Sequence, residues 1–218
     1  MKARMFNQNV VRYIMNGTQS QDRRPLKDQP QGELVCQQDT LGYPASEGFR
    51  WYGFGNPKDP VFYKPRHEVG DIIGVRERVR LVEMSESQIF NDRYYGTFKY
   101  EADGFTTGAK IPDRLKPLVQ GHCCPNGCFK ELIRTFLKVT AVRLERIQDT
   151  TDLDALSEGI QWDDACPEGV SNGYYPGAYD RPSEAFKYLW NSIYPGSWES
   201  NDWVEVTKFE LAEKLCKM

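Results

Sequence analysis

Residues 70–84 read Gly-Asp-Ile-Ile-Gly-Val-Arg-Glu-Arg-Val-Arg-Leu-Val-Glu-Met and give the clearest strand prediction in this chain. The apolar residues recur at every second position, at Ile73, Val75, Val79 and Leu81. Successive side chains of a β-strand point to opposite faces, so this spacing predicts a strand over Asp71–Met84 with one apolar face. The opposite face would then carry the arginines at positions 76, 78 and 80.

Other segments show either this alternation or the apolar spacing of a helix. Alternation and β-branched residues predict further strands, and a three-to-four-residue apolar spacing predicts helices. The expected strands are 96–103, 134–148 and 203–209, and the expected helices are 6–16, 152–158 and one that Ser183 caps. Gly17 would end the first helix in a left-handed conformation, and Thr151 would cap the second. This order predicts an α+β chain, in which a small closed or nearly closed barrel carries peripheral helices.

Composition limits the classes of function. The chain has 218 residues, a net charge of −3 and a sequence pI near 5.6, which argues against a protein that coats nucleic acid through many phosphate contacts. Mean hydropathy is −0.64, and no apolar run approaches the roughly 20 residues of a membrane span. The basic start is not followed by an apolar stretch, so we expect a cytoplasmic protein. We expect one domain over 1–218 with insertions at about 31–64, 104–133 and 160–182.

Five strings, taken together and in this order, resemble the ASCH branch of the PUA-like superfamily, in particular its long bacteriophage-type members. They are NGTQSQDRRPLKDQP (16–30), VGDIIGVRE (69–77), YEADG (100–104), LKVTAVRLERIQDTTDLDALSEGI (137–160) and FKYLWNSIYPGSWESNDWVEVTKF (186–209). The resemblance implies a PUA-like barrel of mixed strands, with a cleft lined by the loop after the first helix. It also implies a phage origin and a role in binding RNA or a nucleotide-like ligand. One bacterial branch of the family hydrolyses the amide of acetylated cytidine.

The loop after the first helix carries the family's signature and is therefore called the signature loop; its residues decide which catalytic mechanism is possible. In the family it usually reads G-x-K-T-x-T-R-R, with the Lys as base, the second Thr as nucleophile and a Glu matching Glu158 that helps to move the proton. Here the corresponding positions are Gln19, Ser20 and Asp22, so the family's mechanism does not transfer and the chain is not expected to use it. The remaining catalytic candidates are Asp22 or Glu158 as general base for water, and Ser20 as a displaced nucleophile. Alternatively, Ser20 and Asp22 serve only to shape the turn.

Basic residues in and near the same loop are candidates for anion contacts. Arg23 and Arg24 match the signature, Lys27 follows them, and Arg76 lies in the VGDIIGVRE string. A guanidinium matches phosphate oxygens or a guanine edge and also stacks on bases. The alternative is structural, with one arginine paired to Glu77 or Glu158 and the other solvated. For the arginine face of residues 70–84, a phosphate ligand or a cross-strand acid such as Glu101 or Glu145 would compensate the charge.

His-Cys-Cys-Pro-Asn-Gly-Cys, residues 122–128, is the candidate metal site. Cys123 and Cys128 bracket a turn and would be two ligands of a structural zinc ion, with His122 or Cys124 as the third and Cys36 or Cys166 as the fourth. Two separated Cys-x-x-Cys pairs, the stronger zinc signature, are absent. Free thiols in a loop are the alternative, and no other cofactor is expected.

Three hypotheses follow for function. The leading one is a protein that binds RNA or a nucleotide-like small molecule in an arginine-lined cleft. The second is an amidohydrolase acting on an acylated nucleoside, and the third is a module that engages a host protein. In each case we expect no membrane partner and a monomer or weak dimer.

Overall fold

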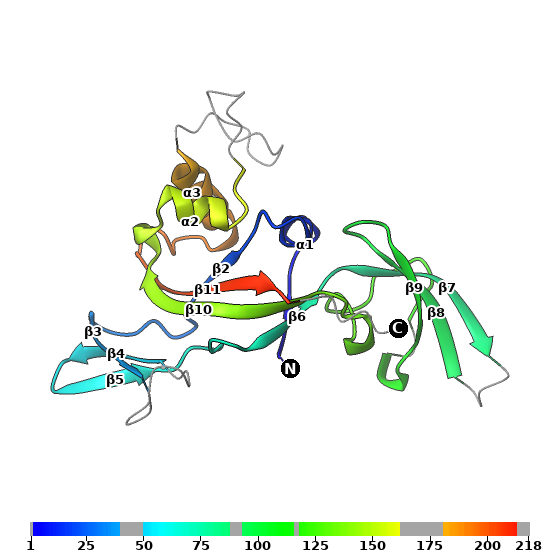
Figure 1. Cartoon of the computed structure of the whole chain (residues 1–218), viewed down its shortest axis with the longest axis horizontal. Coiled ribbons are helices and arrows are strands. Elements are labelled where there is room, and N and C mark those ends of the chain that lie inside the picture. Colours follow the sequence, from blue (N-terminus) through cyan, green and yellow to red (C-terminus); the bar gives the residue numbers. More distant parts are fainter. Residues whose placement is uncertain (1, 40–49, 88–92, 116–117, 162–180, 213–218) are drawn as a thin grey trace. The chain divides into compact units, whose positions relative to one another are not determined.

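The structure is a computed structural model that describes residues 2–39, 50–87, 93–115, 118–161 and 181–212 (Figure 1). It is a mixed α+β chain dominated by strands, as the sequence predicts. Contacts divide it into two compact units, the first formed by residues 1–17, 72–137 and 211–218 and the second by 18–71 and 138–210. Within the described residues, no helix has the length and apolar character needed to cross a membrane.

Among its described residues, the first unit contains strands β1 and β6 to β9 and helix α1. Strand β1 pairs with β6 in parallel, and β7, β8 and β9 form an antiparallel sheet in that order. Their bounds are β1 Lys2–Met5, α1 Gln8–Met15, β6 Ile72–Arg76, β7 Val79–Ser87, β8 Arg93–Tyr100 and β9 Thr106–Lys110, with short 3₁₀ turns at Asp113–Leu115 and Lys130–Leu132. The Asn7 side chain caps α1 by accepting from the Val10 N–H at 2.9 Å. Gly17 follows the helix with φ +81°, the left-handed conformation expected of it.

The stretch 70–84 is two strands rather than the single one predicted. Strand β6 pairs with β1, whereas β7 pairs with β8, so the chain leaves one sheet between Glu77 and Arg78 and enters another. The period-two pattern nevertheless continues across the break, because residues 73, 75, 77, 79 and 81 are all buried. Glu77 belongs to this buried set, and Arg134 pairs with both of its oxygens at 2.8 Å. A buried carboxylate needs such a partner, and the apolar spacing alone did not identify Arg134.

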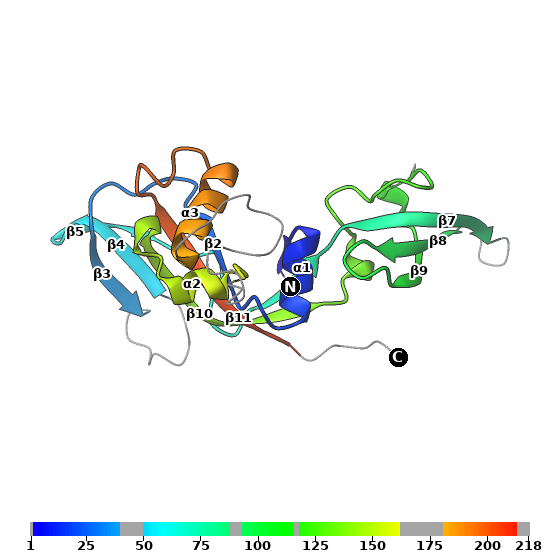
Figure 2. The ribbon, with the colours of Figure 1, turned by 90° about the horizontal axis from the view of Figure 1, so that it is seen from above.

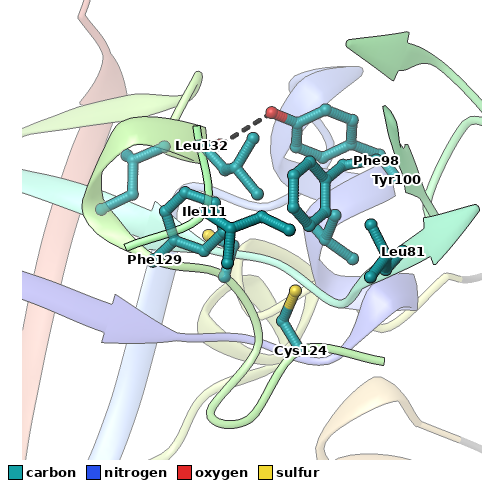
Figure 3. Packing of buried hydrophobic residues seen from close by; sticks show 10 residues of the cluster. Leu81, Phe98, Tyr100, Ile111, Cys124, Phe129 and Leu132 are labelled. Carbon is teal, nitrogen blue, oxygen red and sulfur yellow. Dashed lines mark hydrogen bonds between the residues drawn. The ribbon is translucent and has the colours of Figure 1, made fainter. Parts of the chain in front are cut away.

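The core of the first unit lies against the inner face of β7 and β8. Figure 3 shows Leu81, Phe98 and Ile111 packed around Phe129 and Leu132, with the Tyr100 hydroxyl donating to the Leu132 carbonyl at 2.8 Å. On the outer face, Arg80 pairs with Glu101 at 2.7 Å. For Arg80, this confirms the predicted alternative of a cross-strand acid.

The second unit is built around β10, β11 and β2, which are neighbours in that order. Helices α2 and α3 cover one side of these strands, and the β3–β4–β5 sheet lies on the other side (Figures 1 and 2). The bounds are β2 Gln21–Pro25, β3 Leu34–Asp39, β4 Arg50–Asn56, β5 Asp59–Tyr63, β10 Phe136–Arg146, α2 Asp152–Ser157, α3 Pro182–Ile193 and β11 Trp203–Leu211, with a 3₁₀ turn at Ile147–Asp149. The first residues of β10 belong to the first unit.

Two apolar clusters hold the second unit together. Val204 and Val206 of β11 pack with Phe186 and Trp190 of α3. On the other side, Trp203 packs against residues of β4 and β10, and its ring meets Phe54 edge to face at 5.0 Å. Alternate residues of β11 therefore serve two cores, which is the pattern of a strand buried on both faces.

Four expectations about this unit need correction. Residues 20–30 were expected to be a loop, but Gln21–Pro25 form β2, and β2 is the last strand in its sheet order, where a proline is tolerated. Residues 31–64, expected as an insertion into the barrel, carry β3, β4 and β5, which form a separate sheet. Helix α3 begins after Arg181, not at a Ser183 cap, and Ile193 at its end is exposed because nothing covers that last turn among the described residues. The described strands form open sheets rather than a closed barrel.

Candidate functional site

The signature loop lies beside helix α2. The Ser20 N–H donates to the Ser157 carbonyl at 3.0 Å, and the Ser20 carbonyl accepts from the Phe209 N–H at 2.9 Å. From there β2 runs antiparallel to β11, with Arg23 opposite Val206. This alternation buries the side chains of Gln21 and Arg23 and leaves Asp22 and Arg24 half-buried.

Arg23 has no exposed side-chain surface and meets three carboxylates. Its Nη1 donates to Glu158 Oε1 at 2.9 Å, its Nη2 to Glu145 Oε1 at 2.5 Å, and Asp154 Oδ1 lies 3.3 Å from Nη2. Burial by itself lowers the pKa of a guanidinium, but these carboxylates more than offset it and raise the pKa of Arg23. Arg23 is therefore permanently charged, and its charge is already matched within the protein.

Arg143 and Gln21 complete this group. Arg143 donates from Nε to Glu145 Oε2 at 2.5 Å and from Nη2 to Asp154 Oδ1 at 2.9 Å. The Gln21 amide donates to Glu158 Oε1 at 3.2 Å and accepts from Arg143 Nη1 at 3.2 Å. We call Gln21, Arg23, Arg143, Glu145, Asp154 and Glu158 the polar cluster. It holds three carboxyl groups but only two guanidinium groups.

Glu158 is the carboxyl group of the polar cluster that most easily takes a proton. Burial raises the pKa of Glu158 to about 7, outweighing Arg23, and the neighbouring Asp22 carboxylate acts in the same direction. Asp154 behaves oppositely: hydrogen bonds from Thr151 and the charge of Arg23 outweigh burial and hold its pKa below the ordinary value. With one carboxyl group in excess, the proton goes to Glu158. This residue can therefore give or take a proton near neutral pH, which is what a general acid or base requires.

The other predicted residues of the loop have different surroundings. Arg24 Nε donates to Asp22 Oδ2 at 3.0 Å, and Lys27 and Ser20 are exposed. Gln19, at the family's Lys position, is buried and donates from Nε2 to the Gln21 carbonyl at 3.0 Å. Its Oε1 has no hydrogen-bond partner within the described part of the chain.

Arg76 is described with the first unit, where it is half-buried at the end of β6. It is thus the one predicted anion contact outside the second unit, which contains Arg23, Arg24 and Lys27.

The candidate metal ligands of residues 122–128 do not lie together: some are in the core and others are near the surface. Cys124 and Cys128 are buried in the apolar cluster of the first unit, and burial raises the pKa of each thiol to about 11. Cys123 Sγ accepts from Arg78 Nε at 3.2 Å, and His122 is exposed. No three His, Cys, Asp or Glu side chains are grouped to hold a metal ion within the described ranges. The side chain of Cys36 and all of Cys166 lie outside the described residues.

Sequence reasoning singled out Glu158, Arg23 and Asp22 for this site but missed Gln21, Arg143 and Asp154, and it considered Glu145 only as a partner for the arginine face of residues 70–84. The alternation along β10 gives a signal for two of these residues. Arg143 and Glu145 are charged residues on the strand face that begins with apolar side chains, whereas Val142 and Leu144 lie on the opposite face. The predicted alternative in which an arginine of the loop pairs with Glu158 is confirmed for Arg23.

Comparison with known proteins adds no further constraint. No family model, no curated protein and no solved structure matches this chain.

Proposed function

We propose that this chain is an ASCH-type protein that binds a nucleotide-like ligand at the polar cluster, through the base rather than through a phosphate. The observation that carries the proposal is the meeting of Arg23 and Gln21, from the signature loop, with Glu158, from the family-like string 137–160. Arg23 and Glu158 lie 135 positions apart in the sequence, and the resemblance points to the strings that carry both.

The charges of the cluster favour an uncharged binding partner. A phosphate would face three carboxyl groups, and Arg23 has no free donor fork to offer because Glu145 and Glu158 already engage it. A base edge carries both donors and acceptors. Both oxygens of Glu158 accept from Gln21 or Arg23, so a base edge would have to replace one of these hydrogen bonds. Near neutral pH Glu158 could offer it either a proton or a lone pair, and Gln19 Oε1 is a buried acceptor without a described partner.

Calorimetric titration with the four ribonucleosides, their monophosphates and short RNAs tests this function. We expect a nucleoside to bind about as tightly as its monophosphate, with little dependence on salt, because phosphate contacts would make binding salt-sensitive. Glu158→Gln should weaken binding by about tenfold or more, in the range of a lost hydrogen bond to a charged group. Arg24→Met, which removes the half-exposed arginine of the same strand, serves as the matched control.

Two results would overturn the proposal. The first is no nucleoside binding at millimolar concentration and low salt. The second is binding that requires the phosphate and is lost in Arg24→Met but kept in Glu158→Gln.

Hydrolysis of an acylated nucleoside is the second candidate, and the elevated pKa of Glu158 favours it. In this reaction Glu158 takes a proton from a water molecule while the oxygen of that water attacks the acyl carbon. The C–N bond then breaks, and the proton passes to the departing amine, giving a carboxylic acid and the free nucleoside. Gln19 and Asp22 make the family's covalent route unavailable, so the water route is the one to test.

Chromatography of acetylated cytidine incubated with the protein separates the two candidates. Release of cytidine that is lost in Glu158→Gln supports hydrolysis. Binding without release restricts the function to recognition.

A further inference from the structure

The net charge of the chain is unevenly divided between the two units. The first unit contains 15 Lys and Arg against 9 Asp and Glu, a net charge of +6, whereas the second contains 13 against 22, a net charge of −9. The two values add to the −3 of the whole chain. Such an asymmetry suggests that one part of a protein contacts a polyanion. The acidic total therefore disfavours a polyanion at the second unit but not at the first.

Part of the positive charge of the first unit lies on the outer face of the β7–β8–β9 sheet, opposite to the core shown in Figure 3. Directly opposed residues of antiparallel strands share a face. Arg80 is the register partner of Lys99, and Lys110 is the register partner of Tyr95. Because alternate residues of a strand also share a face, all four side chains lie on the side away from Phe98.

Along β7 the charges on this face are balanced. Arg80 donates from Nε to Glu101 at 2.7 Å and from Nη1 to the Gly121 carbonyl at 2.6 Å. Arg78 also interacts with Glu101, and the exposed Glu83 adds a second carboxylate on this strand. These two arginines and two glutamates cancel, so they leave no net charge for a ligand.

Lys99 and Lys110 are the cations of this face that remain available. Both are exposed, and neither is ion-paired with a carboxylate in the ranges that the structure describes. Four residues separate Lys99 from the Tyr95–Lys110 pair, so the two lysines stand about 14 Å apart along the strand direction. They can therefore hold two phosphates of one extended chain.

The surface between the lysines suits an unpaired base. Tyr95, beside Lys110, is 36% exposed, so its ring can stack on a base. Gly108, opposite Thr97, leaves the centre of the face open, because a Cβ built there would meet no described atom within 4 Å. A sheet face with an exposed aromatic ring and flanking cations offers both interactions that a single strand needs, stacking for its bases and charge for its phosphates.

We infer that the outer face of the β7–β8–β9 sheet binds a single-stranded nucleic acid, with Lys99 and Lys110 on its phosphates and Tyr95 stacked on a base. A duplex is disfavoured, because its paired and stacked bases are not available to Tyr95. The site lies wholly in the first unit, whereas the polar cluster belongs to the second. It does not depend on the proposed function.

Fluorescence anisotropy of the full chain with labelled single strands of about 12 nucleotides tests the inference, with RNA and DNA as separate probes. Binding should weaken as salt rises. In the double variant Lys99→Gln/Lys110→Gln it should be weaker, and the slope of log K against log salt should shrink by about 1.4, since each phosphate contact of a single strand contributes about 0.7. Tyr95→Ala should weaken binding by about fivefold or more and leave the slope unchanged. The matched control Lys138→Gln/Lys208→Gln removes two exposed lysines of the second unit and should bind as the wild type does.

Binding of either strand with these variant effects supports the inference, and the tighter of the two probes identifies the sugar. Four results would overturn it: no binding of either strand at about 50 mM salt, equal losses in the two double variants, binding of a duplex as tight as that of the single strand, or equally effective displacement by polyglutamate, which has the charge but no bases. Nucleoside binding at the polar cluster is a separate readout. It should persist in Lys99→Gln/Lys110→Gln, and Glu158→Gln should leave the salt slope of strand binding unchanged, so either proposal can fail without the other.

Discussion

Replacing Glu158 by Gln should remove a specific part of the pH dependence of stability. The pKa of Glu158 rises from 4.5 to about 7 on folding, chiefly through burial. As pH rises between these values, the unfolded chain loses the proton while the native protein keeps it. The free energy of unfolding must therefore fall with rising pH. One pKa unit corresponds to about 1.4 kcal/mol, so Glu158 alone lowers stability by about 3 kcal/mol between about pH 4 and about pH 8.

Urea unfolding of wild type and Glu158→Gln across this pH range measures the effect. Gln does not titrate and can still accept from Arg23, so the difference in unfolding free energy between the two proteins should shift by about 3 kcal/mol, in favour of the variant at high pH. Glu210→Gln, on the exposed part of β11, should follow the wild type. Parallel pH profiles for wild type and Glu158→Gln would refute the assignment of the proton to Glu158.

Three further predictions concern stability and reactivity. Arg23→Met should lower the free energy of unfolding by about 3–5 kcal/mol, because it leaves buried carboxylates unpaired. Arg24→Met should lower it by about 1 kcal/mol or less. Denaturant titration measures both losses, and equal losses would refute this prediction. Gly127→Ala should cost more than Gly121→Ala in the same assay. Both have φ near +85°, but only at Gly127 would a Cβ lie 3.0 Å from a backbone oxygen, that of Glu77. Cys128 should resist alkylation in the native protein at pH 8, because burial raises its pKa to about 11; mass-spectrometric peptide mapping that shows rapid labelling there would contradict this.

Much of the fold follows from local patterns in the chain. The period-two burial of residues 73–81 survives the break between β6 and β7, since alternation depends only on the extended backbone. The capping box of Thr151 and Asp154, and the left-handed Gly17 and Gly159, likewise depend on neighbours within a few residues. Strand β2 was missed because its sequence is polar. Its side chains are buried by ion pairs rather than by apolar contacts, so hydropathy gives no sign of it.

Local sequence patterns predicted α1, α2, β10 and β11, and they identified two parts of the candidate site, the loop with Arg23 and the helix end with Glu158. The tertiary structure was needed to show how these two parts interact. It places three carboxyl groups around one buried guanidinium, which turns Arg23 from an expected anion contact into an internal counter-charge and leaves Glu158 with a proton near neutral pH. The physical reason is that pKa and ion pairing depend on burial and on charges brought together from β2, β10 and α2. Neither quantity is encoded in the spacing of residues along one segment.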